Sequence, residues 1–409
     1  MDAKNLVVLA ARNVNRNKTR SFLSLAAIAV GVAGLILSGG FVHDLIVQLG
    51  EAVIHSQSGH IQLARPGYFR AGSRSPGKYL IADDEASRLA LGNVAHVQEA
   101  MRRIAFSGLV GNGRSSYPIA GEGIEPDQEA KLGTYMVLQQ GRTMGANDRY
   151  GALVGAGVAH AMNLKPGSTI NIVAPTIDEA MNTLEFEVVG IFQSFSKDYD
   201  DRVVKIPLSA AQELLNSKGA NVIVLLLDDT KNTAAVAQAL RERSKQLGLE
   251  LRTWDSLNDF YAKAVELYDR QFGVLRLIVL IMVLLAVAGA INVAVLERAG
   301  EFGTMRALGN RRAEVMRLVV MEGAIVGMLG ALIGTLLGIG AAVVVAKIGG
   351  IPMPPPPNSN LEFTAQIRLG PAVLTGAFAV GFLATLLASI APALRVARLP
   401  IAEGLRRVR

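Results

Sequence analysis

The chain has no cysteine, one tryptophan and five histidines among its 409 residues. The absence of cysteine excludes a disulfide framework, a thiolate metal site and thiol lipidation. The histidines show no paired spacing with acidic residues, whereas a zinc site needs three or four converging ligands. No segment resembles a nucleophile elbow or a complete phosphate-binding loop. We therefore expect a non-catalytic chain that binds no metal or cofactor.

Charge is missing from four long runs, at 21–42, 277–296, 323–346 and 369–394. About 20 apolar residues, each rising 1.5 Å along a helix, cross a hydrocarbon core roughly 30 Å thick. Buried helices of soluble proteins rarely stay uncharged beyond about 14 residues. The sequence therefore predicts an α-helical membrane protein with four transmembrane helices. Because no run contains an ionisable side chain, an ion-coupled carrier is disfavoured.

Basic residues are concentrated in three segments outside these runs. Residues 1–20 carry five Lys or Arg and one acid, 297–322 carry five Arg and four Glu, and 395–409 carry five Arg and one Glu. Segment 43–276 instead has a net charge of −3. The positive-inside rule then places both termini and 297–322 in the cytoplasm and 43–276 outside. The sequence pI of about 9.6 thus reflects topology and contact with membrane lipids, not nucleic-acid binding.

The sequence pattern of segment 43–276 is typical of an α+β domain. Short β-branched runs alternate with amphipathic helices that end at glycine. We predict two subdomains, because residues 64–135 interrupt the pattern, and helical stalks at 43–57 and 255–276. The expected elements are strand, helix and strand at 151–173, a strand at 184–192, a hairpin tip and strand at 194–208, a helix at 209–219, a buried strand at 221–229 and a helix at 233–248.

These patterns divide the chain into nine segments. The expected order is a cytoplasmic elbow at 1–20, a first span at 21–42, an outer α+β domain with stalks at 43–276, a second span at 277–296, a cytoplasmic helix-containing loop at 297–322, a third span at 323–346, an outer Pro-rich loop at 347–368, a fourth span at 369–394 and a cytoplasmic tail at 395–409.

Two features leave alternatives open. The stretch ERAGEFGTMRALGN, 297–310, reads as a charged helix that stops at Gly309, and it suits docking into a groove on a partner or lying flat on lipid headgroups. The third span carries small residues at every third or fourth position. These are Gly327, Gly330, Gly334 and Gly338. They allow close helix approach, either at a subunit interface or moving seam, or inside the group of four helices.

Three blocks resemble the MacB/FtsX superfamily of ABC-transporter permeases. They are ERAGEFGTMRALGNRRAEVMRLVVMEG at 297–323, NVNRNKTRSFLSLAAIAVGVAG at 13–34 and APALRVARLPIAEGLR at 391–406. SGHIQLARPGYF at 58–69 and MPPPP at 353–357 are similar to the LolC/LolE-like branch, whose characterised members release lipoproteins from the inner membrane.

The resemblance implies a permease subunit of the bacterial inner membrane, paired with a second permease in a homo- or heterodimer and driven by a separate cytoplasmic ABC ATPase dimer that holds the ATP and magnesium. The expected activity is extraction or export of a lipoprotein or another lipid-embedded substrate, with a periplasmic carrier or adaptor as a further partner. The alternative is an FtsX-like mechanotransmitter that activates a periplasmic cell-wall enzyme without moving cargo.

The resemblance also assigns residues. It places the coupling helix, where the ATPase docks, on Glu297, Arg298, Glu301, Met305, Arg306, Leu308 and Gly309. It places the membrane elbow on Arg12, Arg16, Lys18 and Arg20.

Overall fold

The computed structural model describes residues 3–16, 18–72, 76–81, 84–354 and 363–398. The chain forms two compact units. The helical unit comprises Met1–Ile46, Val265–Pro352 and Thr364–Arg409. The α+β unit comprises Val47–Ala264 and Met353–Phe363.

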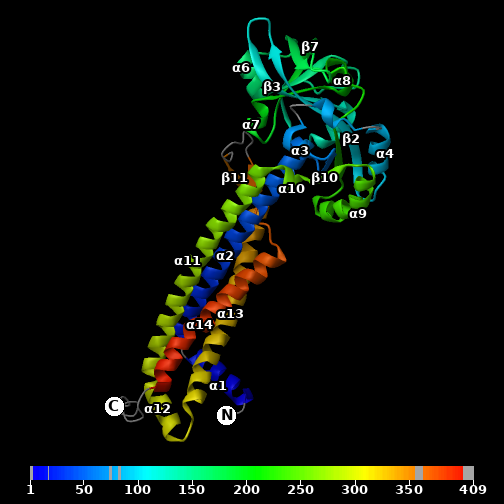
Figure 1. Cartoon of the computed structure of the whole chain (residues 1–409). Coiled ribbons are helices and arrows are strands. Elements are labelled where there is room, and N and C mark those ends of the chain that lie inside the picture. The colour runs from blue at the N-terminus through cyan, green and yellow to red at the C-terminus, as the bar shows by residue number, and fades with distance from the viewer. Residues whose placement is uncertain (1–2, 17, 73–75, 82–83, 355–362, 399–409) are drawn as a thin grey trace. The chain divides into compact units, whose positions relative to one another are not determined.

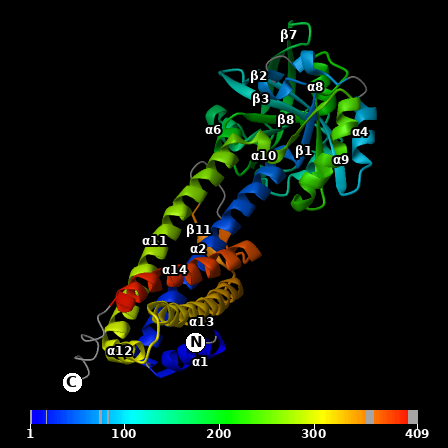
Figure 2. The same ribbon diagram turned by 60° about the horizontal axis from the view of Figure 1, so that its bottom comes forward.

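Four long helices build the helical unit (Figures 1 and 2). Each contains a stretch long and apolar enough to cross a membrane, so the four spans predicted from the uncharged runs are confirmed. The long helices are α2 (Lys18–Val53), α11 (Asp259–Glu297), α13 (Arg312–Lys347) and α14 (Pro371–Arg398). The short helices α1 (Ala3–Arg16) and α12 (Ala299–Ala307) and the paired strands β11 (Ile351–Met353) and β12 (Phe363–Ala365) complete the described elements around them.

The glycine positions of α13 face neighbouring helices of the same chain. A Cβ added at Gly330 would lie 2.8 Å from Cβ of Ile28 on α2, and one at Gly338 would lie 3.0 Å from Cβ of Ile36. At Gly327 the neighbour is Thr385 of α14, 2.9 Å away. These contacts favour packing within this group of helices, and an additional role at a subunit interface stays a prediction.

One mixed ten-stranded sheet organises the α+β unit, in the order β10-β1-β9-β2-β3-β8-β5-β7-β4, with β6 paired to β2 and β7. The strands are β1 (Ile61–Ala64), β2 (Val97–Gly111), β3 (Ser116–Ile124), β4 (Val137–Gly141), β5 (Gly151–Gly155), β6 (Thr169–Pro175), β7 (Met181–Gln193), β8 (Val203–Pro207), β9 (Val222–Leu227) and β10 (Glu250–Thr253). The helices are α3 (Tyr68–Ala71), α4 (Asp84–Gly92), α5 (Pro126–Leu132), α6 (Ala156–Met162), α7 (Lys197–Asp200), α8 (Leu208–Leu214), α9 (Thr233–Gln246) and α10 (Trp254–Leu257).

Two of the hydrophobic clusters on this sheet are the largest, and the division into two subdomains expected from the sequence stays a prediction. One core gathers around Phe106, Val154 and Phe186, with α6 and α8 packed on it. The other lies between β1, β9, α4 and α9, around Leu63 and Leu225. The long strand β2 contributes to both cores.

Within 194–208 the predicted strand is confirmed as β8, but the predicted hairpin tip is wrong. β8 pairs in parallel with β3 and antiparallel with β5, and not with the preceding strand β7. The acidic tip is helix α7, and Asp200 turns inward to accept hydrogen bonds from the backbone N–H of Ser194, at 2.9 and 3.1 Å. The fully buried β8 instead lies between β3 and β5, both distant in sequence.

The boundaries predicted for the helix at 209–219 are also displaced. α8 begins at Leu208, directly after Pro207, and ends at Leu214. Proline readily precedes a helix, so Ser209 lies inside the first turn instead of capping it. Asn216 then adopts a left-handed conformation with φ 49°, and the helix stops before Gly219.

His60 is a buried histidine at the junction of β1, β9 and β10. Its Nδ1 accepts the N–H of Leu227 at 3.1 Å, and its Nε2 lies 3.0 Å from Oγ1 of Thr230. Burial, and then the nearby His55, lower the pKa of His60 to about 4. The neutral imidazole is therefore part of the folded structure.

We expect acidification to destabilise the α+β unit through His60. The unfolded chain, with an ordinary histidine pKa, binds more protons between about pH 6.5 and pH 4, so stability falls as the pH decreases through this window. The loss from about pH 7.5 to about pH 5 should be roughly 2 kcal/mol. Urea titrations of the full chain, followed by fluorescence of Trp254, its single tryptophan, measure it. His60→Asn, which keeps an acceptor for Leu227, should lose this dependence; an equal dependence in the variant would contradict the assignment.

Candidate functional site

The helix α12 follows α11 and precedes α13 in the sequence, and its C-terminal end is closed by a glycine. At its C-terminus Gly309 adopts φ 97°, the N–H of Asn310 donates to the Met305 carbonyl and the N–H of Gly309 donates to the Arg306 carbonyl, both at 3.1 Å. This pair of bonds is the Schellman motif that closes helices at glycine. The sequence-based prediction of a stop at Gly309 is confirmed.

One face of α12 packs into the helical unit, and the residue after the helix projects from it. Phe302 is buried and Met305 half-buried against a cluster that includes Val315 and Leu318 of α13. Leu308 is 82 % exposed. A large aliphatic side chain at a helix tip with this exposure is costly in water, and burial against a partner would recover the apolar area.

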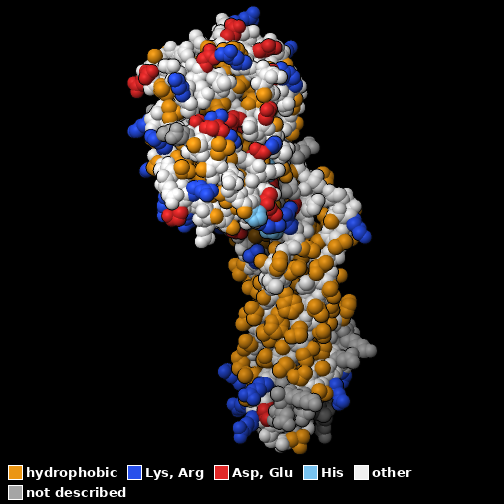
Figure 3. Space-filling model, turned by 90° about the vertical axis from the view of Figure 1, so that its right-hand side faces the viewer, with side chains coloured by type: hydrophobic (Ala, Val, Ile, Leu, Met, Phe, Trp, Pro, Cys, Tyr) orange, Lys and Arg blue, Asp and Glu red, His pale blue; other side chains and the backbone are white. Residues whose placement is uncertain are grey.

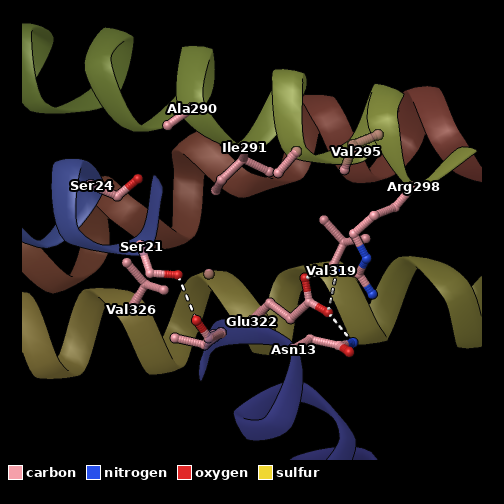
Figure 4. Close-up of a pocket in the computed structure, with 13 residues that line it drawn as sticks. Asn13, Ser21, Ser24, Ala290, Ile291, Val295, Arg298, Val319, Glu322 and Val326 are labelled. Atoms are coloured by element: carbon pink, nitrogen blue, oxygen red, sulfur yellow. Dashed lines mark hydrogen bonds and ion pairs between the residues drawn. The ribbon is translucent and has the colours of Figure 1, made fainter. Parts of the chain in front are cut away.

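Arg298, at the junction of α11 and α12, is the centre of an ion-pair network (Figure 4). Its Nε donates to Oε2 of Glu301 and its Nη1 to Oε2 of Glu322, both at 2.9 Å. Its guanidinium also lies 5.1 Å from the ring centroid of Phe302. The buried arginine therefore fixes α12 to α13 through two carboxylates.

The N-terminal helix α1 joins the same network. Asn13 donates from Nδ2 to Oε1 of Glu322 at 2.6 Å, and Arg16 forms an ion pair with Glu301. Partial burial works against the Glu301 charge, but hydrogen bonds from Arg298 and Arg16 hold the pKa of this carboxyl below its ordinary value. Three helices, α1, α12 and α13, are thus connected by charged groups.

A cavity of about 70 Å³ lies beside this network, lined by polar groups of Asn13, Ser21 and Ser24 and by apolar side chains of α11 and α13. Figure 4 shows these side chains converging from α1, α2, α11 and α13. This volume holds only a few water molecules. The site can transmit force between helices, but it has no room for a nucleotide.

The structure separates the predicted docking residues into two groups. Glu297, Leu308 and Gly309 are exposed and Arg306 is half-buried, whereas Arg298 is inside the network. Glu301 is exposed but shared between two arginines. The sequence reasoning missed Asn13 and Glu322 as partners. Glu322 is the last charged residue before an uncharged run, and this position could have indicated a paired carboxylate. No feature of the sequence singles out Asn13.

The elbow residues divide in the same way. Arg12 and Arg16 are exposed on α1, and Lys18 begins α2. The side chains of Lys18 and Arg20 lie outside the described residues, as do the Pro-rich segment from residue 355 to 362 and the tail from 399 onward.

Two protein-family models match the chain. The model described as "MacB-like periplasmic core domain" matches residues 21–243, and the one described as "FtsX-like permease C-terminal" matches residues 273–401. The first match covers the first long helix and most of the α+β unit, and the second covers the remaining three long helices with α12.

Curated relatives are similar over nearly the whole chain. A lipoprotein-releasing system transmembrane protein LolC of Neisseria meningitidis serogroup B is 23% identical over 97% of this chain and 96% of its own length. An uncharacterized ABC transporter permease of Methanocaldococcus jannaschii is 21% identical over 85% of this chain and 86% of its own. A macrolide export ATP-binding/permease protein MacB of Rhodospirillum rubrum is 26% identical over 96% of this chain, which covers 58% of that protein.

Proposed function

This chain belongs to the MacB/FtsX superfamily of ABC-transporter permeases, and we propose that α12 is the coupling helix through which a cytoplasmic ATPase drives it. The observation that carries the proposal is the construction of α12. It is anchored by Arg298, Glu301 and Glu322 and presents the exposed Leu308. A flexible loop would absorb a push, whereas an anchored helix passes it to α11 and α13.

The proposed topology places α12 and both termini in the cytoplasm and the α+β unit in the periplasm. Figure 3 supports it: apolar side chains cover the middle of the helical unit, and Lys and Arg gather at its α12 end. The positive-inside rule assigns such an end to the cytoplasm. The chain itself would be non-catalytic, with ATP and magnesium held by the ATPase dimer.

The proposed cargo is a lipoprotein or another lipid-embedded molecule of the inner membrane. The support is the name of the LolC relative, which is similar along its whole length, and the absence of charge from the four runs of the sequence, which suits a cargo that travels in lipid. A second permease subunit would complete a homo- or heterodimer, and a periplasmic carrier or adaptor would receive the cargo.

Co-purification in mild detergent, followed by mass spectrometry of retained proteins and lipidated peptides, tests this function. We expect an ABC ATPase together with triacylated lipoproteins. An ATPase with a cell-wall hydrolase and no lipoprotein would instead support the FtsX-like mechanotransmitter. Recovery of the intact chain without any ATPase would contradict the role of α12.

A further inference from the structure

The α+β unit contains a set of buried charges that the sequence did not indicate. Arg103 of β2 donates from Nε and Nη2 to Glu129 of α5, at 3.1 and 2.7 Å. Nζ of Lys205, on β8, lies 2.7 Å from the same carboxylate. The three side chains are at most 6% exposed. Burial alone would raise the pKa of Glu129, but Arg103 and Lys205 hold it at about 2, so the carboxylate is ionised.

Stability does not explain why this set is present. Removing two or three charges from water costs several kcal/mol per ion, and well-packed apolar replacements of buried ion sets are often neutral or stabilising. A buried ion set can instead impose a particular arrangement on the segments that it connects.

Arg103 connects the sheet to the end of α2. Its Nη1 donates to the backbone carbonyl of Gln57, which lies in the π-helical turn Ile54–Ser58 that directly continues α2. π-turns are rare and occur often at functional positions. The next residue, Gly59, has φ 63°, and a Cβ there would lie 2.4 Å from Val224 of β9. The chain thus leaves α2 in a closely packed turn that the guanidinium holds.

The junction with α11 lies across a cavity from this contact. The cavity has a volume of about 240 Å³, and its lining includes Gln57 and Ser58 on the α2 side and Leu257 and Asn258 on the α11 side. Asn258 has an extended backbone and separates α10 from α11. A polar cavity of this size accommodates water. Both junctions therefore line this cavity, and on the α2 side the ion-paired Arg103 holds the turn through Gln57.

We propose that Arg103 is a positioning residue that locks the end of α2 to the sheet, so that movement of α2 reaches the α+β unit. This inference rests on the proposed function for its mechanical role. The locking itself is independent of that function and can be measured separately.

Hydrogen exchange of the full chain in detergent tests the locking. In Arg103→Met, amides of residues 57–60 should exchange about tenfold faster, because the turn loses its anchor. Arg102→Met is the matched control: the neighbouring arginine lies on the opposite face of β2 and pairs with Glu125, so these amides should stay protected. Arg103→Lys keeps the charge without the guanidinium fork, and full protection in this variant would overturn the role of the Gln57 contact.

Cargo release by the assembled complex tests the mechanical role. Arg103→Met should retain ATP hydrolysis within about twofold, because α12 is unchanged, while release falls by at least about tenfold. Release at the unsubstituted rate would overturn the proposal. The triple variant Arg103→Met, Glu129→Leu, Lys205→Met removes every charge of the set while keeping apolar volume, and it makes the same prediction if the single variant unfolds. Absence of ATP-driven release in the unsubstituted complex would contradict the proposed function and leave the exchange result standing.

Discussion

Replacing Leu308 with Asp is expected to weaken docking of the ATPase by roughly thirtyfold, the effect of losing an interface hot spot worth about 2 kcal/mol. The leucine is 82% exposed, so the substitution removes little contact within the isolated chain. In the complex it would place a carboxylate in the apolar pocket that receives the leucine, where an unpaired charge is costly. Titration of the purified permease with its ATPase, read as binding and as stimulated hydrolysis, measures the effect.

Two variants give the Leu308 experiment its controls. Leu308→Met keeps an apolar side chain of similar volume and should bind within about threefold of the unsubstituted chain. Leu247→Asp changes a partly exposed leucine of the α+β unit and should not affect docking. Unchanged affinity in Leu308→Asp would show that the ATPase contacts another surface, and α12 would then be an interfacial helix on the lipid headgroups.

The network around Arg298 changes the expectation for the charged residues of this segment. From the sequence, replacing Glu301 together with Arg306 should abolish coupling to the ATPase by removing docking contacts. In the structure Glu301 forms ion pairs with Arg298 and Arg16 of the same chain, so it holds α12 in place. Loss of coupling in a Glu301 variant would therefore report a loosened α12 as well as a lost contact, whereas Leu308 reports docking alone.

Local patterns of the sequence predict the helices well. An uncharged run long enough to span lipid has few alternatives, and the Gly309 stop follows from the left-handed conformation that glycine adopts without strain. In the same way, the alternation of Leu184–Phe192 is typical of a strand, and this segment lies within β7.

Long-range pairing is what the sequence could not supply. Arg298 forms an ion pair with Glu322, 24 residues away in the sequence, and Lys205 forms one with Glu129, 76 residues away. No periodic signal connects such positions, because the partners meet only after separate elements have packed. The same limit explains the error at β8, whose neighbours β3 and β5 are both distant in sequence, whereas the hairpin prediction considered only its adjacent strand.

A large loss of stability is expected at Gly334, where an added side chain on α13 would meet the backbone of α2. A Cβ at this position would lie 2.6 Å from the carbonyl oxygen of Ala29 and 2.9 Å from its Cα. Both atoms belong to the backbone of α2, so no side chain can rotate away and the two helices must separate. We expect Gly334→Ala to destabilise the helical unit by about 3 kcal/mol, the upper range for overpacking a close-packed core.

Gly340 provides a matched control on the same helix, because a Cβ there would meet nothing within 4 Å. Gly340→Ala should be neutral or stabilising by up to about 1 kcal/mol, since alanine favours a helix over glycine. Unfolding by SDS in mixed micelles, followed by circular dichroism of the helices, compares the two variants directly. If Gly334→Ala unfolds at the same SDS fraction as Gly340→Ala, α2 and α13 do not approach this closely in the membrane. The glycines would then be available to a second subunit, the alternative that the sequence left open.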